Sequence, residues 1–175
     1  MNDATAEWLN ALDDAAAGEQ FRKCCGAEAW VTAMASQRPF VDGAALRTCA
    51  ERCFDELAPD AWIAAFNSHP RIGDLNSLRM RLAGNKQWSA GEQAGMNASE
   101  ETTIQRLAEG NKVYDERFGY PFIVCATGRT AADMCAILYQ RLENAPAAEL
   151  AIAADEQRKI TLLRLEKLTP PADAV

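Results

Sequence analysis

The sequence predicts an all-α fold: a single domain over residues 1–175, made of about eight or nine helices with one irregular apolar segment. Three observations lead to this fold class. Alanine is abundant, whereas glycine and proline number only 10 and 7, a mixture that favours helices. Apolar residues recur at helical spacing along most of the chain, and no strand pair, internal repeat or linker is recognisable. A chain of 175 residues is also long enough to bury a sizeable core without disulfides.

The N-terminal region predicts three short helices. Leu9 and Leu12 lie on one face of a helix over residues 6–16, as their helical spacing requires. A second helical stretch begins at Glu19. A third covers residues 27–36, and the Arg-Pro pair that follows it ends the helix, because a residue before proline avoids helical geometry.

Two further helices are predicted before the middle of the chain. Asp42 is a suitable N-cap for a helix that runs to Leu57. Pro59 stands where a first-turn proline belongs, so it predicts a helix that runs to about Ser68. The buried stripe of the longer helix is expected to consist of Leu46, Cys49, Cys53 and Leu57.

The second half of the chain predicts four more helices. The helix that ends at Phe118 is expected to bury Ile104, Leu107, Val113 and Tyr114. The four run from Ser89 to about Met96, from a cap at Asn97 or Ser99 to Phe118, from Thr130 to about Glu143, and from Pro146 or Ala147 to Leu168.

Residues 119–129 interrupt this pattern. They form a short apolar run between glycine and proline signals, which predicts extended or irregular backbone. Local chemistry favours a buried, strand-like core segment. The alternative is that its backbone N–H and C=O groups, free of a helical ladder, line a pocket for a ureido or imide ligand. The residues concerned are Phe122, Ile123, Val124, Cys125 and Ala126.

The charge of the chain argues against two classes of partner. The net charge is −7 with a pI of about 4.8, so neither a nucleic acid backbone nor an anionic membrane surface is expected to bind. No apolar run is long enough to span a bilayer. A small anionic substrate stays possible, because a few arginines facing one pocket can override the global charge.

The six cysteines are expected to be small core residues. Cys49 and Cys53 are four positions apart on a helical pattern, which could suggest a ligand pair. However, the one histidine is far from every cysteine in sequence, so no plausible metal site is expected. With no recognisable signal peptide, the sequence predicts a reduced, cytoplasmic protein.

His69 is the first candidate for chemistry. Pro70 biases it away from helical geometry, which places it just past a helix C-terminus. There the helix dipole favours the imidazolium form, and a histidine so placed can exchange a proton with a substrate near neutral pH. The alternative is a structural histidine that caps the last helix carbonyls.

Ser89, Glu92 and Gln93 form a second candidate. Ser89 and Glu92 fit a capping box, in which the serine accepts a backbone N–H and the glutamate reaches back to the cap. The functional alternative is a helix N-terminus that holds an anion. Glu92 would then polarise a neighbouring group, and Gln93 would bond an amide ligand.

Arg164 is the third candidate, because apolar residues flank it on both sides. Its charge must either point into a pocket or extend along the surface. In a polar cavity it would bind a carboxylate with two parallel hydrogen bonds. Exposure to solvent or contact with a partner is the default interpretation.

Together these segments resemble the signature blocks of the OHCU decarboxylases, where OHCU is 2-oxo-4-hydroxy-4-carboxy-5-ureidoimidazoline. Three blocks carry the resemblance in family order, and a looser C-terminal pattern around Arg164 supports it. They are Ser-His-Pro-Arg-Ile-Gly-Asp at 68–74, Ser-x-x-Glu-Gln-x-Gly at 89–95 and Phe-Gly-Tyr-Pro-Phe-Ile-Val-Cys-Ala at 118–126.

The resemblance implies an all-α fold, usually a homodimer, that needs neither a metal nor an organic cofactor. The implied reaction gives (S)-allantoin and CO₂ in urate degradation. By position, the resemblance makes His69 the acid–base residue, assisted by Glu92, and Pro70 a substrate contact. It also implies that Ser89 and Gln93 bind the substrate, together with the backbone of 122–126 and Arg164.

Two other functions fit the same residues. One is a cofactor-free lyase or hydrolase that acts on a different ureido or imidazolone compound, which a substrate panel would reveal. The other is a non-catalytic helical interaction module, which predicts that allantoin does not change the melting temperature.

Overall fold

The computed structural model describes residues 1–69 and 98–171, with side chains for all of these except 98–100, and every regular element in them is an α-helix. The predicted all-α fold is therefore confirmed. The helix expected from Ser89 to Met96 lies outside the described residues. The chain divides into two compact units, residues 1–68 with 154–175 (unit 1) and residues 69–153 (unit 2). None of the described helices is long and apolar enough to cross a bilayer.

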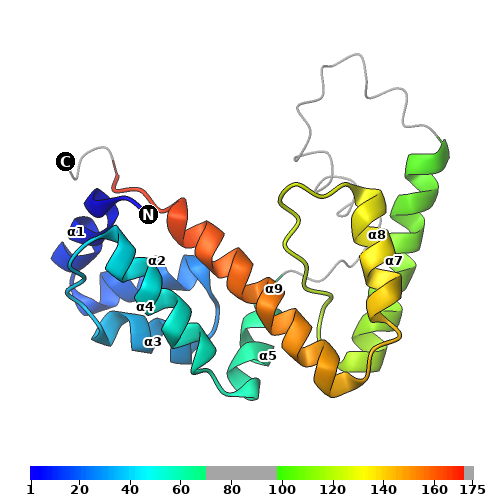
Figure 1. Ribbon diagram of the computed structural model, residues 1–175, viewed down its shortest axis with the longest axis horizontal. Coiled ribbons are helices and arrows are strands. Elements are labelled where there is room, and N and C mark those ends of the chain that lie inside the picture. Colours follow the sequence, from blue (N-terminus) through cyan, green and yellow to red (C-terminus); the bar gives the residue numbers. More distant parts are fainter. Residues whose placement is uncertain (70–97, 172–175) are drawn as a thin grey trace, which may run out of the picture. The chain divides into compact units, whose positions relative to one another are not determined.

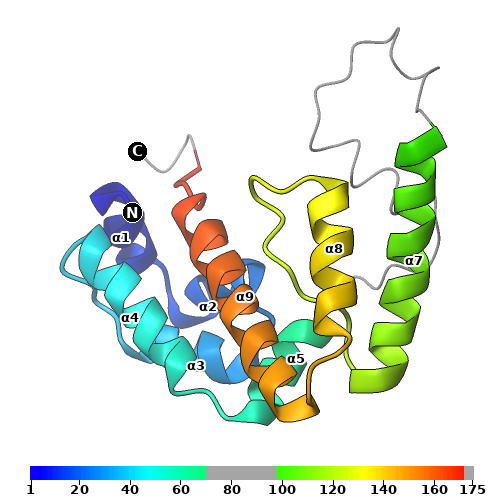
Figure 2. The same cartoon turned by 45° about the vertical axis from the view of Figure 1, so that its right-hand side comes forward.

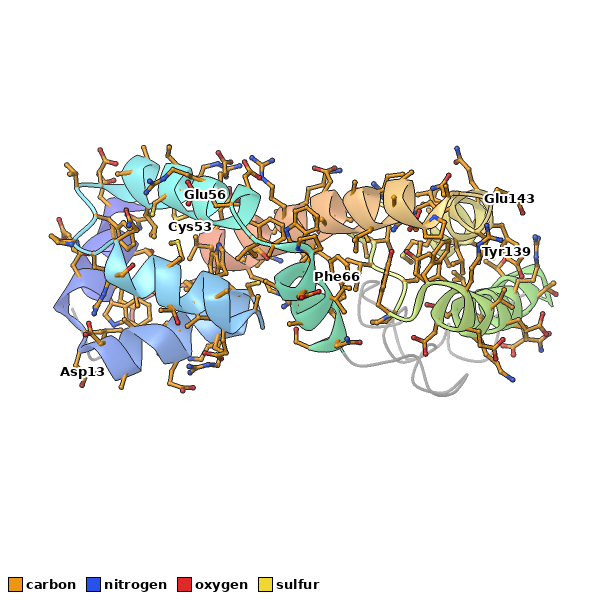
Figure 3. All side chains as sticks on the ribbon, turned by 90° about the horizontal axis from the view of Figure 1, so that it is seen from below. Asp13, Cys53, Glu56, Phe66, Tyr139 and Glu143 are labelled. Atoms are coloured by element: carbon orange, nitrogen blue, oxygen red, sulfur yellow. The ribbon has the colours of Figure 1, made fainter. Side chains whose placement is uncertain are left out.

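Unit 1 is a helical bundle in which α2 packs on α3, α3 on α4 and α5, and α1 on α4 (Figure 1). Trp30 lies fully buried at its centre and donates its indole N–H to the Ala50 carbonyl at 3.1 Å. Phe66 of α5 and Cys53 of α4, both labelled in Figure 3, are also buried. The helices are α1 (Asp3–Ala11), α2 (Asp14–Cys24), α3 (Glu28–Ser36), α4 (Gly43–Asp55), α5 (Pro59–Asn67) and the later part of α9 (Pro146–Glu166).

The chemistry of helix N-termini explains why two helix starts were predicted correctly and why one predicted helix is wrong. Asp42 caps α4 by accepting from the Ala45 N–H at 2.7 Å, and Pro59 begins α5, as predicted. The single helix expected over residues 6–16 is wrong. Asp13 accepts from the Ala16 N–H at 2.7 Å and so starts a new helix, because an aspartate at this position satisfies an N–H that has no partner within the helix.

Unit 2 is built on α7 (Ala98–Phe118) and α8 (Ala131–Arg141), which lie side by side and run in the same direction (Figures 1 and 2). Tyr139 of α8, labelled in Figure 3, donates to the Arg106 carbonyl of α7 at 3.3 Å. At Gly110 of α7, a Cβ atom would come within 2.7 Å of the Leu138 side chain of α8, so the absence of a side chain permits this close approach. Val113 was expected to be buried but is 49% exposed, because on the helix it lies about 100° or more from the buried stripe of Ile104, Leu107 and Tyr114.

Residues 119–130 connect the ends of these two parallel helices, so the chain must return along them before α8 can begin (Figure 2). The backbone of this return segment is irregular, as the sequence predicts. Gly119 and Gly128 stand near its two ends with φ of +80° and +76°. Both angles lie in the left-handed region, which glycine adopts without the steric cost that a Cβ atom adds.

All six cysteines are buried free thiols. Burial raises the pKa of the Cys24 thiol to about 12, against the opposing charge of Arg164, and it raises the pKa of Cys25 as well. Since the thiolate is the reactive form, these two cysteines are held in an inert state at neutral pH. This agrees with their expected role as small core residues.

Gly26 permits the loop between α2 and α3 to touch the end of α5, and we predict that Gly26→Ala destabilises the protein by about 1–3 kcal/mol. A Cβ atom there would overlap the Cβ and Oγ atoms of Ser68; rotation about χ1 could move the oxygen, but the Cβ atom is bonded to the backbone and cannot move away. Gly18→Ala is the matched control, since its nearest contact is Val31 at 3.7 Å. It should leave the free energy of unfolding in urea unchanged or raise it by about 0.5–1 kcal/mol. Equal effects of the two substitutions would contradict this close contact.

At Gly119 the cost of a side chain should be purely conformational, because a Cβ atom would meet nothing within 4 Å. We expect Gly119→Ala to lower the free energy of unfolding by about 1–2 kcal/mol. Gly119→Asn should cost about half as much, since asparagine tolerates the left-handed region better than alanine does. Urea denaturation of both variants measures the difference, and an alanine variant as stable as the parent protein would rule out the left-handed turn.

Candidate active site

His69 follows the end of α5, where the sequence placed it. The helix ends at Asn67, Ser68 is its C-cap, and His69 is half-buried in the bend that comes next. Ser68 donates its backbone N–H to the Ala64 carbonyl at 3.2 Å and its hydroxyl to the Ala65 carbonyl at 2.6 Å. Ser68 therefore supplies donors for these carbonyls, which is the task that the structural alternative assigned to the histidine.

Four of the other predicted site residues cannot be compared with the structure. Pro70, Ser89, Glu92 and Gln93 lie outside the described residues, so their roles stay predictions. The remaining ones divide between the units: His69 and residues 122–126 belong to unit 2, and Arg164 belongs to unit 1.

The return segment alternates in burial over residues 121–126. Ile123 and Cys125 are buried, at 2% and 9% exposure, whereas Phe122, Val124 and Ala126 between and beside them are half-buried. A period of two is the pattern of extended backbone, in which successive side chains point in opposite directions. The segment thus combines two predicted features, a buried apolar side and backbone that is free of a helical ladder.

A buried ion pair lies beside the return segment. Glu149, near the start of α9, is fully buried, and Arg141, the last residue of α8, is 5% exposed. The arginine Nε and Nη2 atoms lie 2.7 and 2.5 Å from Oε1 of Glu149. The other carboxylate oxygen accepts from the side-chain amide of Asn144 at 2.7 Å. Both carboxylate oxygens therefore have partners, as a buried charge requires.

Arg141 also holds the return segment directly. Its Nη1 atom donates to the Ile123 carbonyl at 2.8 Å, and its guanidinium carbon lies 4.8 Å from the centroid of the Phe122 ring. Tyr114 of α7 donates its hydroxyl hydrogen to Glu149 and packs edge-on against the Phe122 ring at 5.2 Å. We call the side chains of Tyr114, Phe122, Arg141 and Glu149, together with the Ile123 carbonyl, the anchoring cluster.

Electrostatics keeps the phenols of this region neutral. Burial raises the pKa of Tyr114 well above its ordinary value, and the hydrogen bond to Glu149 raises it further. Burial also raises the pKa of Tyr120, and the negative charge of Glu149 adds to this effect. Both hydroxyl groups consequently remain protonated at neutral pH, and Tyr114 can act as a donor to the buried carboxylate.

The sequence analysis did not identify Arg141 and Glu149. One signal was present for the arginine: it follows Met134 by seven positions and Leu138 by three, and both of these are buried on α8. That spacing places a charge on the buried face of a helix, where an arginine needs a partner. No comparable local pattern marked Glu149.

Arg164 is exposed, and its guanidinium donates to the carbonyl of Cys24, the last residue of α2, at 3.4 Å. A cation at a helix C-terminus is favourable because it interacts with carbonyls that lack partners within the helix. The structure therefore gives Arg164 a contact within unit 1. Its predicted role toward a substrate carboxylate is not tested by this contact.

An open groove of about 850 Å³ in the described part of the chain lies among α1, α2 and α3. None of the predicted site residues lines it. Its buried arginine, Arg38, already donates to the carbonyls of Leu9 and Leu12 and to Asp14. Within residues 1–69 and 98–171, no group of three or more histidine, cysteine or acidic side chains could hold a metal ion.

Comparison with known sequences gives a consistent result. The model of the OHCU decarboxylase family matches residues 10–166. The chain is 35% identical over 150 residues to the uric acid degradation bifunctional protein TTL of Arabidopsis thaliana, covering 86% of this chain but only 46% of that protein. It is also 28% identical to the 2-oxo-4-hydroxy-4-carboxy-5-ureidoimidazoline decarboxylase of Haloferax volcanii, covering 94% of this chain and 96% of that one.

The structural comparison agrees. A crystal structure of OHCU decarboxylase in the presence of (S)-allantoin superimposes with a TM-score of 0.65 and 35% identity, covering 89% of this chain and 97% of that one. The family model extends over parts of both units and over the return segment with its anchoring cluster. The chain therefore belongs to the OHCU decarboxylase family.

Proposed function

We propose that this protein decarboxylates 2-oxo-4-hydroxy-4-carboxy-5-ureidoimidazoline to (S)-allantoin and CO₂, a step of urate degradation. Membership of the family makes the protein a carboxy-lyase. The observation that carries the specific reaction is the likeness to a solved decarboxylase that was crystallised with (S)-allantoin, 97% of which this chain covers. The substrate is a small anionic ureido-imidazoline.

Decarboxylation of this substrate needs no external electron acceptor from the protein. When the bond to the carboxyl carbon breaks, the electron pair delocalises into the adjacent ring system, so the substrate is its own electron sink. We therefore propose that no cofactor takes part. The enzyme has to hold the carboxylate out of the ring plane, stabilise the developing charge and deliver one proton to one face of the ring carbon.

We propose that His69 promotes loss of CO₂ and supplies that proton, with Glu92 as its polarising partner. The position of His69 just past the end of α5 supports this role, because a helix C-terminus favours a protonated imidazole. Pro70, Ser89 and Gln93 are proposed to contact the substrate. Arg164 is proposed to bind its carboxylate, and the extended backbone of 122–126 its ring and ureido groups.

The proposal also covers the domain organisation, the oligomeric state and the location of the protein. The family model spans residues 10–166, which supports one catalytic domain made of both units. We also propose a homodimer located in the cytoplasm. The six free thiols are consistent with a reducing compartment.

His69→Asn should lower kcat by about 10²–10⁴-fold, the range that positioned acid–base groups contribute. Freshly made substrate is supplied, and the circular dichroism of the allantoin formed reports both its rate of formation and its handedness. The parent protein should give the (S) product. An asparagine variant with full rate and unchanged stereochemistry would remove His69 from the mechanism. A parent protein that acts on another ureido compound in a substrate panel, but not on this one, would instead overturn the proposed reaction.

Glu92→Ala should lower kcat because His69 loses its partner, while Glu92→Gln should retain part of any helix-capping effect without the charge. If Glu92 is only a cap, both variants will turn over substrate like the parent protein, and the alanine variant will lose about 0.5–2 kcal/mol of stability. The same circular dichroism assay, run beside thermal denaturation, separates the two roles.

A further inference from the structure

The return segment cannot be held in place by its own backbone. Residues 1–69 and 98–171 contain no strand that could pair with this extended segment, so its polar groups must find other partners or remain unsatisfied in the core. At Ile123 the partner is Arg141, whose Nη1 atom lies 2.8 Å from the carbonyl oxygen. This hydrogen bond joins the middle of the segment to the end of α8.

Arg141 is itself held in one orientation. All three of its guanidinium nitrogens are engaged: Nε and Nη2 with Glu149, Nη2 with the Tyr114 hydroxyl at 3.3 Å, and Nη1 with Ile123. The Phe122 ring lies against the guanidinium carbon at 4.8 Å. A planar group with this many fixed contacts has a single favourable orientation, which a flexible lysine would not share.

We propose that Arg141, oriented by Glu149, is a positioning residue for the decarboxylation, because it fixes the register of residues 122–126 against α8. This inference rests on the proposed function, in which the backbone of that segment binds the substrate. A shift of the segment by part of an ångström would misalign several backbone groups with the ring and ureido groups. Because these contacts exist before the reaction begins, their loss should weaken substrate binding more than it slows the chemical step.

The test has to separate positioning from stability, since Arg141→Met leaves Glu149 buried without its cation. That single variant should lose about 10 °C in Tm. The double variant Arg141→Met/Glu149→Gln removes both charges at similar volume, so we expect a Tm within about 3 °C of the parent protein. It still has no donor for the Ile123 carbonyl. Its KM should rise about tenfold, while kcat falls less than about threefold.

Arg38→Met is the matched control for a buried arginine that bonds backbone carbonyls. The Arg38 side chain is 9% exposed, against 6% for Arg141, and it donates to Leu9 and Leu12 at 2.7 and 2.6 Å in unit 1. Its substitution should lower Tm but leave KM unchanged. Amide hydrogen exchange gives a second readout: protection over residues 122–126 should fall in the double variant and not in Arg38→Met.

A double variant with the parent Tm, the parent KM and full protection over 122–126 would overturn the positioning role and leave the proposed function intact. A raised KM in Arg38→Met as well would also overturn it, because general destabilisation would then explain the effect. If the parent protein forms no allantoin, the proposed function fails first and the positioning role fails with it.

Discussion

The parallel course of α7 and α8 is the constraint on which the rest of unit 2 depends. Neighbouring helices that run in opposite directions need a connection of only a few residues, whereas these two require the chain to return along their length. With 11 residues, α8 is about 16 Å long. The six residues 121–126 cover about 20 Å when extended. Extended backbone inside a helical protein is thus a geometric consequence of two helices that point the same way.

That extended backbone creates a need that the anchoring cluster meets. A carbonyl beside the core requires a donor, and Arg141 supplies one to Ile123. The buried arginine in turn requires an anion, which Glu149 supplies, and the carboxylate also accepts hydrogen bonds from Tyr114 and Asn144. Each member satisfies the next, so removal of either charged side chain alone leaves its partner buried without a counter-ion. Such closed polar networks define a single local structure.

This rigidity suits a reaction that depends on placement. The proposed cofactor-free decarboxylation asks the protein for orientation, charge stabilisation and one proton, and small displacements of the groups that hold the substrate are costly. The proposed division of labour follows from the two local structures. His69 stands at the end of α5, where the dipole favours a protonated imidazole. The return segment offers backbone donors and acceptors whose positions are set by the fully engaged side chain of Arg141.

The sequence by itself determined what local chemistry controls: the all-α class, the cap at Asp42, the helix start at Thr130, the first-turn proline of α5 and the irregular segment. It also carried the family resemblance from which the acid–base role of His69 is proposed. Its errors, the merged helix over 6–16 and the burial of Val113, arose where a competing cap or the position of the buried stripe on α7 decided the outcome. Only the tertiary structure showed that Arg141 and Glu149 meet each other and Ile123, because bringing groups from α8, α9 and the return segment together is a property of long-range packing that sequence spacing does not encode.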